Sequence, residues 1–195
     1  MKKIDLKTTF YEQVIVCLSF MFLFILQNEV IYPLETMSRS DGFVNQASLF
    51  YLPHGLKVFS AIVMGVWCLP VIFIMQLANG LYFIGSINAE MFLETALACL
   101  AIGLPIILLN KTLKQPPFLS LLENKIIDVS LFWLFLSLAL ITSLLNSLTQ
   151  SFVIGAPNNQ LLWYYLLGDI AGSIGFFIFI VLMLKLKNGF FRMSK

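Results

Sequence analysis

Long apolar runs separated by short polar stretches define the organisation of this chain. Six of these runs are predicted to be helices, with approximate bounds 10–31, 47–66, 67–86, 90–109, 127–148 and 160–186. A helix needs roughly 20 apolar residues to cross a bilayer, and no run shows the alternating pattern of a barrel strand. The sequence therefore predicts an all-α, polytopic membrane bundle of about six transmembrane helices that occupies residues 1–195 as one integral membrane domain.

The second and third predicted helices come from one long apolar region, 43–88, in which Lys57 is the only Lys, Arg, Asp or Glu. Pro53 and Pro70 lie within it, and a proline removes one helical hydrogen bond. We therefore predict short or broken helices around Pro53 and Pro70, joined by a tight turn. Pro53 would mark a kink or an interrupted helix start. A re-entrant hairpin is the alternative for this region.

Basic residues predict the orientation of the chain. Three lysines precede the first helix, the 110–125 loop is rich in lysine, and the C-terminus is basic. Cytoplasmic loops carry an excess of Lys and Arg, so both termini are predicted to be cytoplasmic. This needs an even number of crossings, which fits six helices, or four helices with a re-entrant pair. The stretches 33–46 and 149–160 are predicted to be outer loops.

Composition supports the membrane assignment and excludes several functions. The chain is 59% hydrophobic and 11% charged, whereas soluble domains are about 25% charged. Its net charge of +2 is small and lies at the ends and in one loop, so no nucleic-acid partner is expected. Cys17, Cys68 and Cys99 lie inside apolar runs and are interpreted as small buried hydrophobic residues.

Motifs for catalysis or metal binding are not found in the sequence. His54 is the single histidine, and no second histidine or cysteine stands at ligand spacing from it. Nucleophile-elbow, zinc-protease and phosphate-loop patterns are also lacking. We therefore predict no catalytic residue, no metal, no cofactor and no enzymatic activity.

Ionisable side chains inside the apolar runs mark the candidate site. His54 and Lys57 lie in the second predicted helix, and Asp169 lies near the middle of the sixth. Charges at that depth normally face a protein interior or a water-filled cavity. The simplest arrangement pairs Lys57 with Asp169, either as part of a ligand site or as a structural lock. Asn79 and Trp163 complete the predicted ligand-binding set.

Small residues accompany these polar groups. Gly168, Gly172 and Gly175 stand at positions i, i+4 and i+7, which forms a smooth stripe on one helix face. Such stripes let a neighbouring helix approach closely. Together with the helix-start residues Pro53 and Gly55, Gly168 and Gly172 are predicted to shape the backbone around the site.

Other polar residues have simpler interpretations. Glu29 is predicted to lie at the headgroup level, with a cavity-lining acid as the alternative. Glu90 and Glu94 stand one turn apart at a helix start, where the macrodipole favours acids, and a site role is the alternative. Helix-packing contacts are predicted for the polar residues of the fifth helix, which are Ser137, Thr142, Ser143 and Asn146.

Two short motifs carry a family resemblance. The first is Leu52-Pro53-His54-Gly55-Leu56, followed by Gly65, Trp67 and Pro70, and the second is Trp163 with Gly168-Asp169-Ile170-Ala171-Gly172. This order resembles the membrane-associated sensor (MASE-type) domains of bacterial signalling proteins. The resemblance implies an integral membrane sensory module in the bacterial inner membrane. No output domain follows Lys195, so signalling through a separate partner is expected.

The sequence therefore predicts a sensory or regulatory membrane module. It would bind a small ligand or a partner helix in an intramembrane polar cavity, and signal through a cytoplasmic or membrane protein partner within the lipid bilayer. A small transporter, or the substrate-binding membrane subunit of one, is the first alternative. A structural assembly subunit without a ligand is the second.

Overall fold

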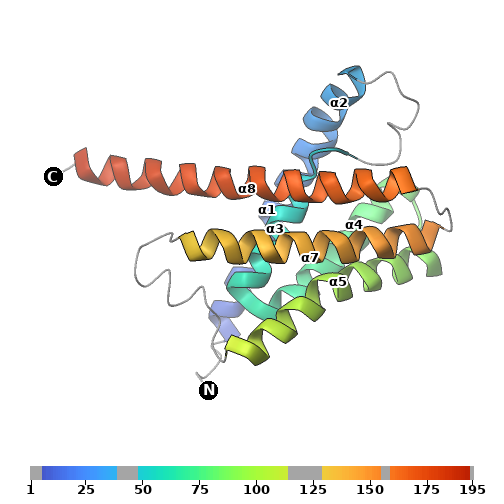
Figure 1. Cartoon of the computed structure of the whole chain (residues 1–195), viewed down its shortest axis with the longest axis horizontal. Helices are drawn as coiled ribbons and strands as arrows, with labels where there is room; N and C mark the ends of the chain where they lie inside the picture. Colours follow the sequence, from blue (N-terminus) through green and yellow to red (C-terminus); the bar gives the residue numbers. More distant parts are fainter. Residues whose placement is uncertain (1–5, 39–47, 114–128, 155–158, 194–195) are drawn as a thin grey trace.

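The computed structural model describes residues 6–38, 48–113, 129–154 and 159–193, and every regular element in them is a helix. The elements are α1 (Leu6–Leu26), the π-helix η1 (Gln27–Ile31), α2 (Tyr32–Ser38), α3 (Leu52–Met64), the 3₁₀-helix η3 (Gly65–Cys68), α4 (Leu69–Ile84), α5 (Ala89–Leu113), α7 (Val129–Ile154) and α8 (Asn159–Met193) (Figure 1).

Five helical segments of the described chain are long and apolar enough to cross a membrane. They are Phe10–Met37, Leu52–Tyr82, Ala89–Leu109, Phe132–Thr149 and Leu162–Met183. The predicted class, a helical integral membrane protein, is thereby confirmed for the described residues. Their apolar surfaces fit a lipid bilayer. The count of six crossings stays a prediction, because Leu52–Tyr82 contains both α3 and α4.

The centre of the bundle lies where α3, α7 and α8 meet. In Figure 1, α7 and α8 lie side by side and run in opposite directions, with α5 crossing obliquely beside α7. Val58 and Ile62 of α3 pack against Phe135 and Ala139 of α7 and Phe177 of α8. This packing fixes the three helices that carry the candidate site.

The first helix continues past Pro33, where the sequence predicted an outer loop to begin. In η1 the Tyr32 N–H donates to the Gln27 carbonyl, five residues back instead of four. Proline has no N–H, and a π-turn next to it adjusts the hydrogen-bond ladder locally. The helix therefore extends through Ser38, and the rest of the predicted loop, 39–46, lies outside the described residues.

The long apolar region forms two helices, α3 and α4, joined by η3. Gly65 has a φ of 61°, a positive value that glycine adopts without steric strain. Pro53 and Pro70 lie in the first turns of α3 and α4, where no helical hydrogen bond is lost. The structure therefore places the break between the two helices at Gly65. Each proline lies at the start of a helix and does not interrupt one.

Helix α1 runs beside α4. The Gln13 side chain donates a hydrogen bond to the Trp67 carbonyl at 3.1 Å, and the Phe24 ring meets the Tyr82 ring edge-on at 5.9 Å. These contacts align α1 and α4 in the same direction. The end of α1 lies against the start of α3, so α3 and α4 run in opposite directions on either side of η3.

The remaining helices begin close to their predicted positions. Helix α5 starts after Asn88, whose side-chain oxygen accepts a hydrogen bond from the Met91 N–H at 2.8 Å. Asn88 is therefore the N-cap, and Glu90 adds a favourable charge in the first turn. Helices α7 and α8 extend several residues beyond the predicted 127–148 and 160–186 at their C-terminal ends.

Candidate functional site

A closed polar cluster lies at the junction of α3, α7 and α8. His54 of α3 and Asp169 of α8 are only 1% and 2% exposed, with Nδ1 3.3 Å from Oδ2. The other ring nitrogen, Nε2, lies 3.1 Å from Thr142 Oγ1 and 3.3 Å from Ser143 Oγ, both on α7. Asn146 donates to Asp169 Oδ2 at 2.7 Å. We refer to these five residues as the closed cluster.

The hydrogen-bond directions assign the protons of the closed cluster. Thr142 Oγ1 donates to the Leu138 carbonyl at 2.7 Å, so it accepts from His54 Nε2, which therefore carries a proton. His54 Nδ1 and Asp169 Oδ2 lie at ion-pair distance without the alignment of a hydrogen bond. The two side chains therefore form a close polar pair in a site removed from solvent.

Three polar residues of α7 make the predicted helix-packing contacts, and these contacts reach the candidate site. Thr142, Ser143 and Asn146 stand at i, i+1 and i+4, which is one face of a helix, and this face meets His54 and Asp169. That spacing was the available signal in the sequence. Ser137, predicted to pack in the same way, is exposed. The partners of the charged pair thus come from a helix that the sequence analysis left out of the site.

The backbone that precedes α3 packs against glycines of α8. A Cβ on Gly168 would overlap the Ser48 carbonyl oxygen, and one on Gly172 would overlap the Tyr51 carbonyl oxygen. The Tyr51 N–H donates to the Gly168 carbonyl at 2.9 Å. Non-helical backbone therefore lies directly on the glycine stripe, which is the close approach that the stripe predicted.

Pro53 and Gly55 place the first turn of α3 on the same surface. Pro53 stands in the first helical turn, where its fixed φ suits a helix start. A Cβ on Gly55 would overlap the side chain of Phe176 on α8. Because Gly55 has none, His54 comes close enough to α8 to reach Asp169.

Gln27 holds the 48–52 backbone from the other side, a role that the sequence analysis missed. It is 3% exposed, donates to Ser48 Oγ at 2.9 Å and accepts from the Leu52 N–H at 3.2 Å. Glu35, which the sequence placed in an outer loop, accepts from Ser48 Oγ at 3.0 Å and from the Leu49 N–H at 3.1 Å. These contacts satisfy backbone and hydroxyl groups that would otherwise lack partners in an apolar environment.

The predicted pairing of Lys57 with Asp169 is wrong. Lys57 is 4% exposed, and its ammonium lies 5.7 Å from the centre of the Phe20 ring and 5.6 Å from that of Tyr51. Asp169 pairs with His54 instead. A step of three residues turns the side-chain direction by about 60°, so His54 and Lys57 face different neighbours. A cation held over desolvated rings gains about 2 kcal/mol from the ring quadrupole.

Two other predicted site residues lie outside the closed cluster. Trp163 is 57% exposed on α8, a position suited to the amphipathic indole at a membrane interface. Asn79 lies on α4, next to α1 and away from α8. Of the predicted ligand-binding set, only His54 and Asp169 therefore lie together, and Lys57, Asn79 and Trp163 each lie elsewhere.

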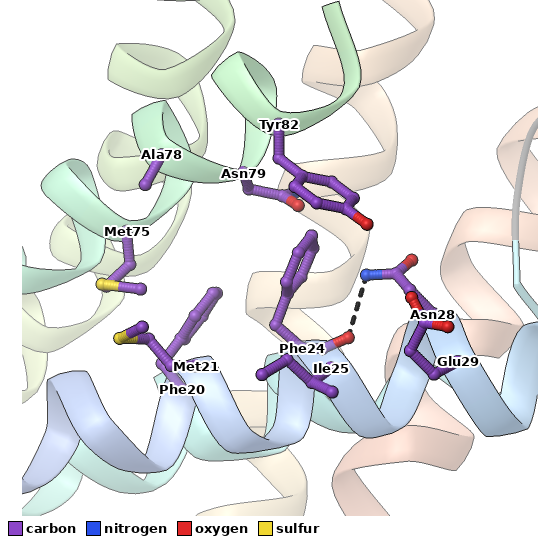
Figure 2. Close-up of a pocket in the computed structure, with 10 residues that line it drawn as sticks. All are labelled: Phe20, Met21, Phe24, Ile25, Asn28, Glu29, Met75, Ala78, Asn79 and Tyr82. Carbon is purple, nitrogen blue, oxygen red and sulfur yellow. Dashed lines mark hydrogen bonds between the residues drawn. The ribbon is translucent and has the colours of Figure 1, made fainter.

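A groove between α1 and α4 is the second candidate site (Figure 2). Its volume is about 280 Å³. Large apolar side chains line most of it, and polar side chains gather at the end formed by η1. We refer to it as the α1–α4 groove. The residues that line it include Phe20, Phe24, Glu29, Met75, Asn79 and Tyr82.

Comparisons of the chain with protein-family models, with curated proteins and with solved structures return no match. Among the described residues, no group of three or more His, Cys, Asp and Glu side chains is arranged to hold a metal ion. The described sites therefore offer hydrogen-bonding groups, with internal partners in the closed cluster and an unpartnered acceptor, Asn79 Oδ1, in the α1–α4 groove.

Proposed function

We propose that the protein is a non-enzymatic sensory or regulatory module of the membrane. In this proposal the closed cluster holds α3 against α7 and α8. When this contact breaks, α3 moves, and a separate cytoplasmic partner responds to the movement. The observation that carries the proposal is the buried His54–Asp169 pair. Hydrophobic residues of similar size would often stabilise a core at least as well, so such a pair is better explained as a contact that forms and breaks as a unit.

The ends of α3 are suited to movement of this helix. The 48–51 segment before it is non-helical, and Gly65 after it has positive φ. Hinges are a few residues at element ends that absorb large changes in φ and ψ. With a hinge at each end, α3 can shift on α8 as a rigid body when the His54–Asp169 contact changes.

The two motifs that resemble MASE-type sensor domains are in contact. His54 of the first motif pairs with Asp169 of the second, and Gly172 lies against the backbone that enters α3. This proximity supports a shared role for the motifs. The proposal includes a bacterial inner-membrane location, cytoplasmic termini, and six crossings in which α3 and α4 count separately.

A transporter, or the substrate-binding subunit of one, is the second candidate. The observation that favours it is the non-helical 48–51 segment between the glycine stripe of α8 and Gln27. Interrupted helices of this kind form substrate and ion sites in many transporters. Solute uptake into proteoliposomes distinguishes this candidate, because a sensory module gives no uptake above that of empty liposomes.

Hydrogen exchange of the protein in lipid nanodiscs tests the proposed switch. Asp169→Asn should raise amide exchange throughout 52–64 while leaving α5 unchanged, because the side chain of Asp169 makes polar contacts only with His54 of α3 and Asn146 of α7 among the described residues. Ser173→Ala is the matched control. It lies one turn away on α8, is equally buried and bonds only to the Asp169 carbonyl. A uniform rise across all helices would contradict the proposal and favour a structural subunit.

A further inference from the structure

The α1–α4 groove changes from apolar to polar along its length. Phe20 and Met75 line its apolar part, while Asn79, Tyr82 and Glu29 gather near the end of α1 (Figure 2). Both walls belong to segments long and apolar enough to cross a membrane, Phe10–Met37 and Leu52–Tyr82. The groove is therefore apolar at one end and polar at the other, which matches the apolar acyl chain and the polar headgroup of a lipid.

The π-helix η1 creates the polar end. Gln27 points toward the 48–52 backbone, while the next two residues, Asn28 and Glu29, line the groove. Asn28 donates its side-chain N–H to the Phe24 carbonyl at 2.9 Å, which directs it along α1 (Figure 2). Single π-turns inside α-helices are frequent at functional sites because they redirect side chains in this way.

The polar end presents hydrogen-bond acceptors. Asn79 Oδ1 is buried and accepts no hydrogen bond from the part of the chain that the structure describes. Glu29 is exposed at the mouth of the groove and adds a carboxylate. A buried acceptor without a donor is rare in proteins, and its desolvation is unfavourable until a donor arrives. Both groups therefore favour an occupant with N–H donors and positive charge.

We propose that the α1–α4 groove binds a membrane phospholipid whose headgroup carries a primary ammonium. One acyl chain lies against Met21, Ile25 and Ala78, and the ammonium reaches Glu29 and Asn79. A volume of about 280 Å³ accommodates part of one chain, with the rest of the lipid in the bilayer. The site is distinct from the closed cluster and does not depend on the proposed sensory function.

Three features select this occupant over others. Exposed Met21 and Ile25 flank the groove, so it opens to the surface that the bilayer covers. No Lys or Arg is among the ten residues that line it, so an anionic headgroup would lie beside Glu29 without a compensating cation. A quaternary ammonium has the charge but no N–H to donate to Asn79. A primary ammonium supplies both the charge and the donors.

Native mass spectrometry of the detergent-purified protein tests the proposal. Phosphatidylethanolamine and phosphatidylglycerol with identical acyl chains are titrated separately against the wild type and the variants. Ala78→Phe fills the groove, and Ala89→Phe adds the same ring at an exposed site on α5. Glu29→Gln removes the charge, and Glu90→Gln is its control at the exposed start of α5.

The wild type should bind phosphatidylethanolamine about tenfold more tightly than phosphatidylglycerol, which corresponds to one charge-assisted hydrogen bond. Glu29→Gln should remove this preference, and Ala78→Phe should weaken phosphatidylethanolamine binding about tenfold. Asn79→Leu, which keeps the side-chain volume, should give a similar loss if Ala78→Phe does not fold. Equal binding of the two lipids, or an unchanged preference in Glu29→Gln, would overturn the proposal and indicate non-selective annular lipid.

Discussion

The closed cluster and the α1–α4 groove place polar side chains in apolar helices with opposite results. At the closed cluster, Gly168, Gly172 and Gly55 bring the backbones together, so the protein itself supplies hydrogen-bond partners to His54 Nε2 and Asp169 Oδ2. At the groove, large side chains line α1 and α4, and the Asn79 oxygen has no donor among the described residues. Small residues at a helix contact thus bring polar partners within reach, whereas a groove lined by large side chains leaves a polar group open to an external partner.

This difference implies different consequences of mutation. Breaking a satisfied buried network leaves groups without partners and lowers stability strongly. Changing a groove that already contains an unsatisfied acceptor affects stability little and binding strongly. Phe20 lines the groove, and its ring also lies beneath the Lys57 ammonium of α3.

Gly172→Ala should destabilise the protein most, by about 3 kcal/mol, because the added Cβ would overlap the Tyr51 backbone. The Cβ added by Gly175→Ala would meet only the far end of the Phe50 ring, which can move. Thermal unfolding in detergent, followed by tryptophan fluorescence, should give a much lower Tm for Gly172→Ala than for Gly175→Ala. Equal Tm values would show that close backbone approach does not control the closed cluster.

His54→Gln and Asp169→Asn should each lower stability by up to about 3 kcal/mol, since each leaves a buried polar partner unpaired. A double-mutant cycle on denaturant unfolding should show a coupling energy above about 1 kcal/mol between them. Lys57→Met combined with Asp169→Asn should give a smaller coupling, because Lys57 lies over the Phe20 and Tyr51 rings and Asp169 contacts His54 instead. The reverse order of couplings would restore the original sequence prediction.

Asn79→Leu should change stability by less than about 1 kcal/mol, because the removed oxygen accepts no hydrogen bond from the described residues. The measurement is denaturant unfolding in a detergent free of added lipid, with Asp169→Asn unfolded in parallel as the comparison. A loss as large as that of Asp169→Asn would remove the contrast between the two regions. It would show that Asn79 belongs to the packed interior.

Much of the closed cluster followed from local sequence features. A histidine and an aspartate deep in apolar helices must face a protein interior, and a glycine stripe must receive a close neighbour. Those two rules led to His54, Asp169, Gly168 and Gly172. They did not lead to Thr142, because serine and threonine often satisfy themselves on their own helix and then carry no functional signal.

The sequence by itself determined the class of the protein, since hydrophobic run length and low charge leave a helical membrane bundle as the solution. Only the tertiary structure decided the partner of each polar group. Depth along a helix can be counted from the sequence, but the direction in which a side chain points depends on helix rotation and packing. Lys57, Trp163 and Asn79 were predicted at one site, and packing directed them to an aromatic pair, an exposed surface and a groove.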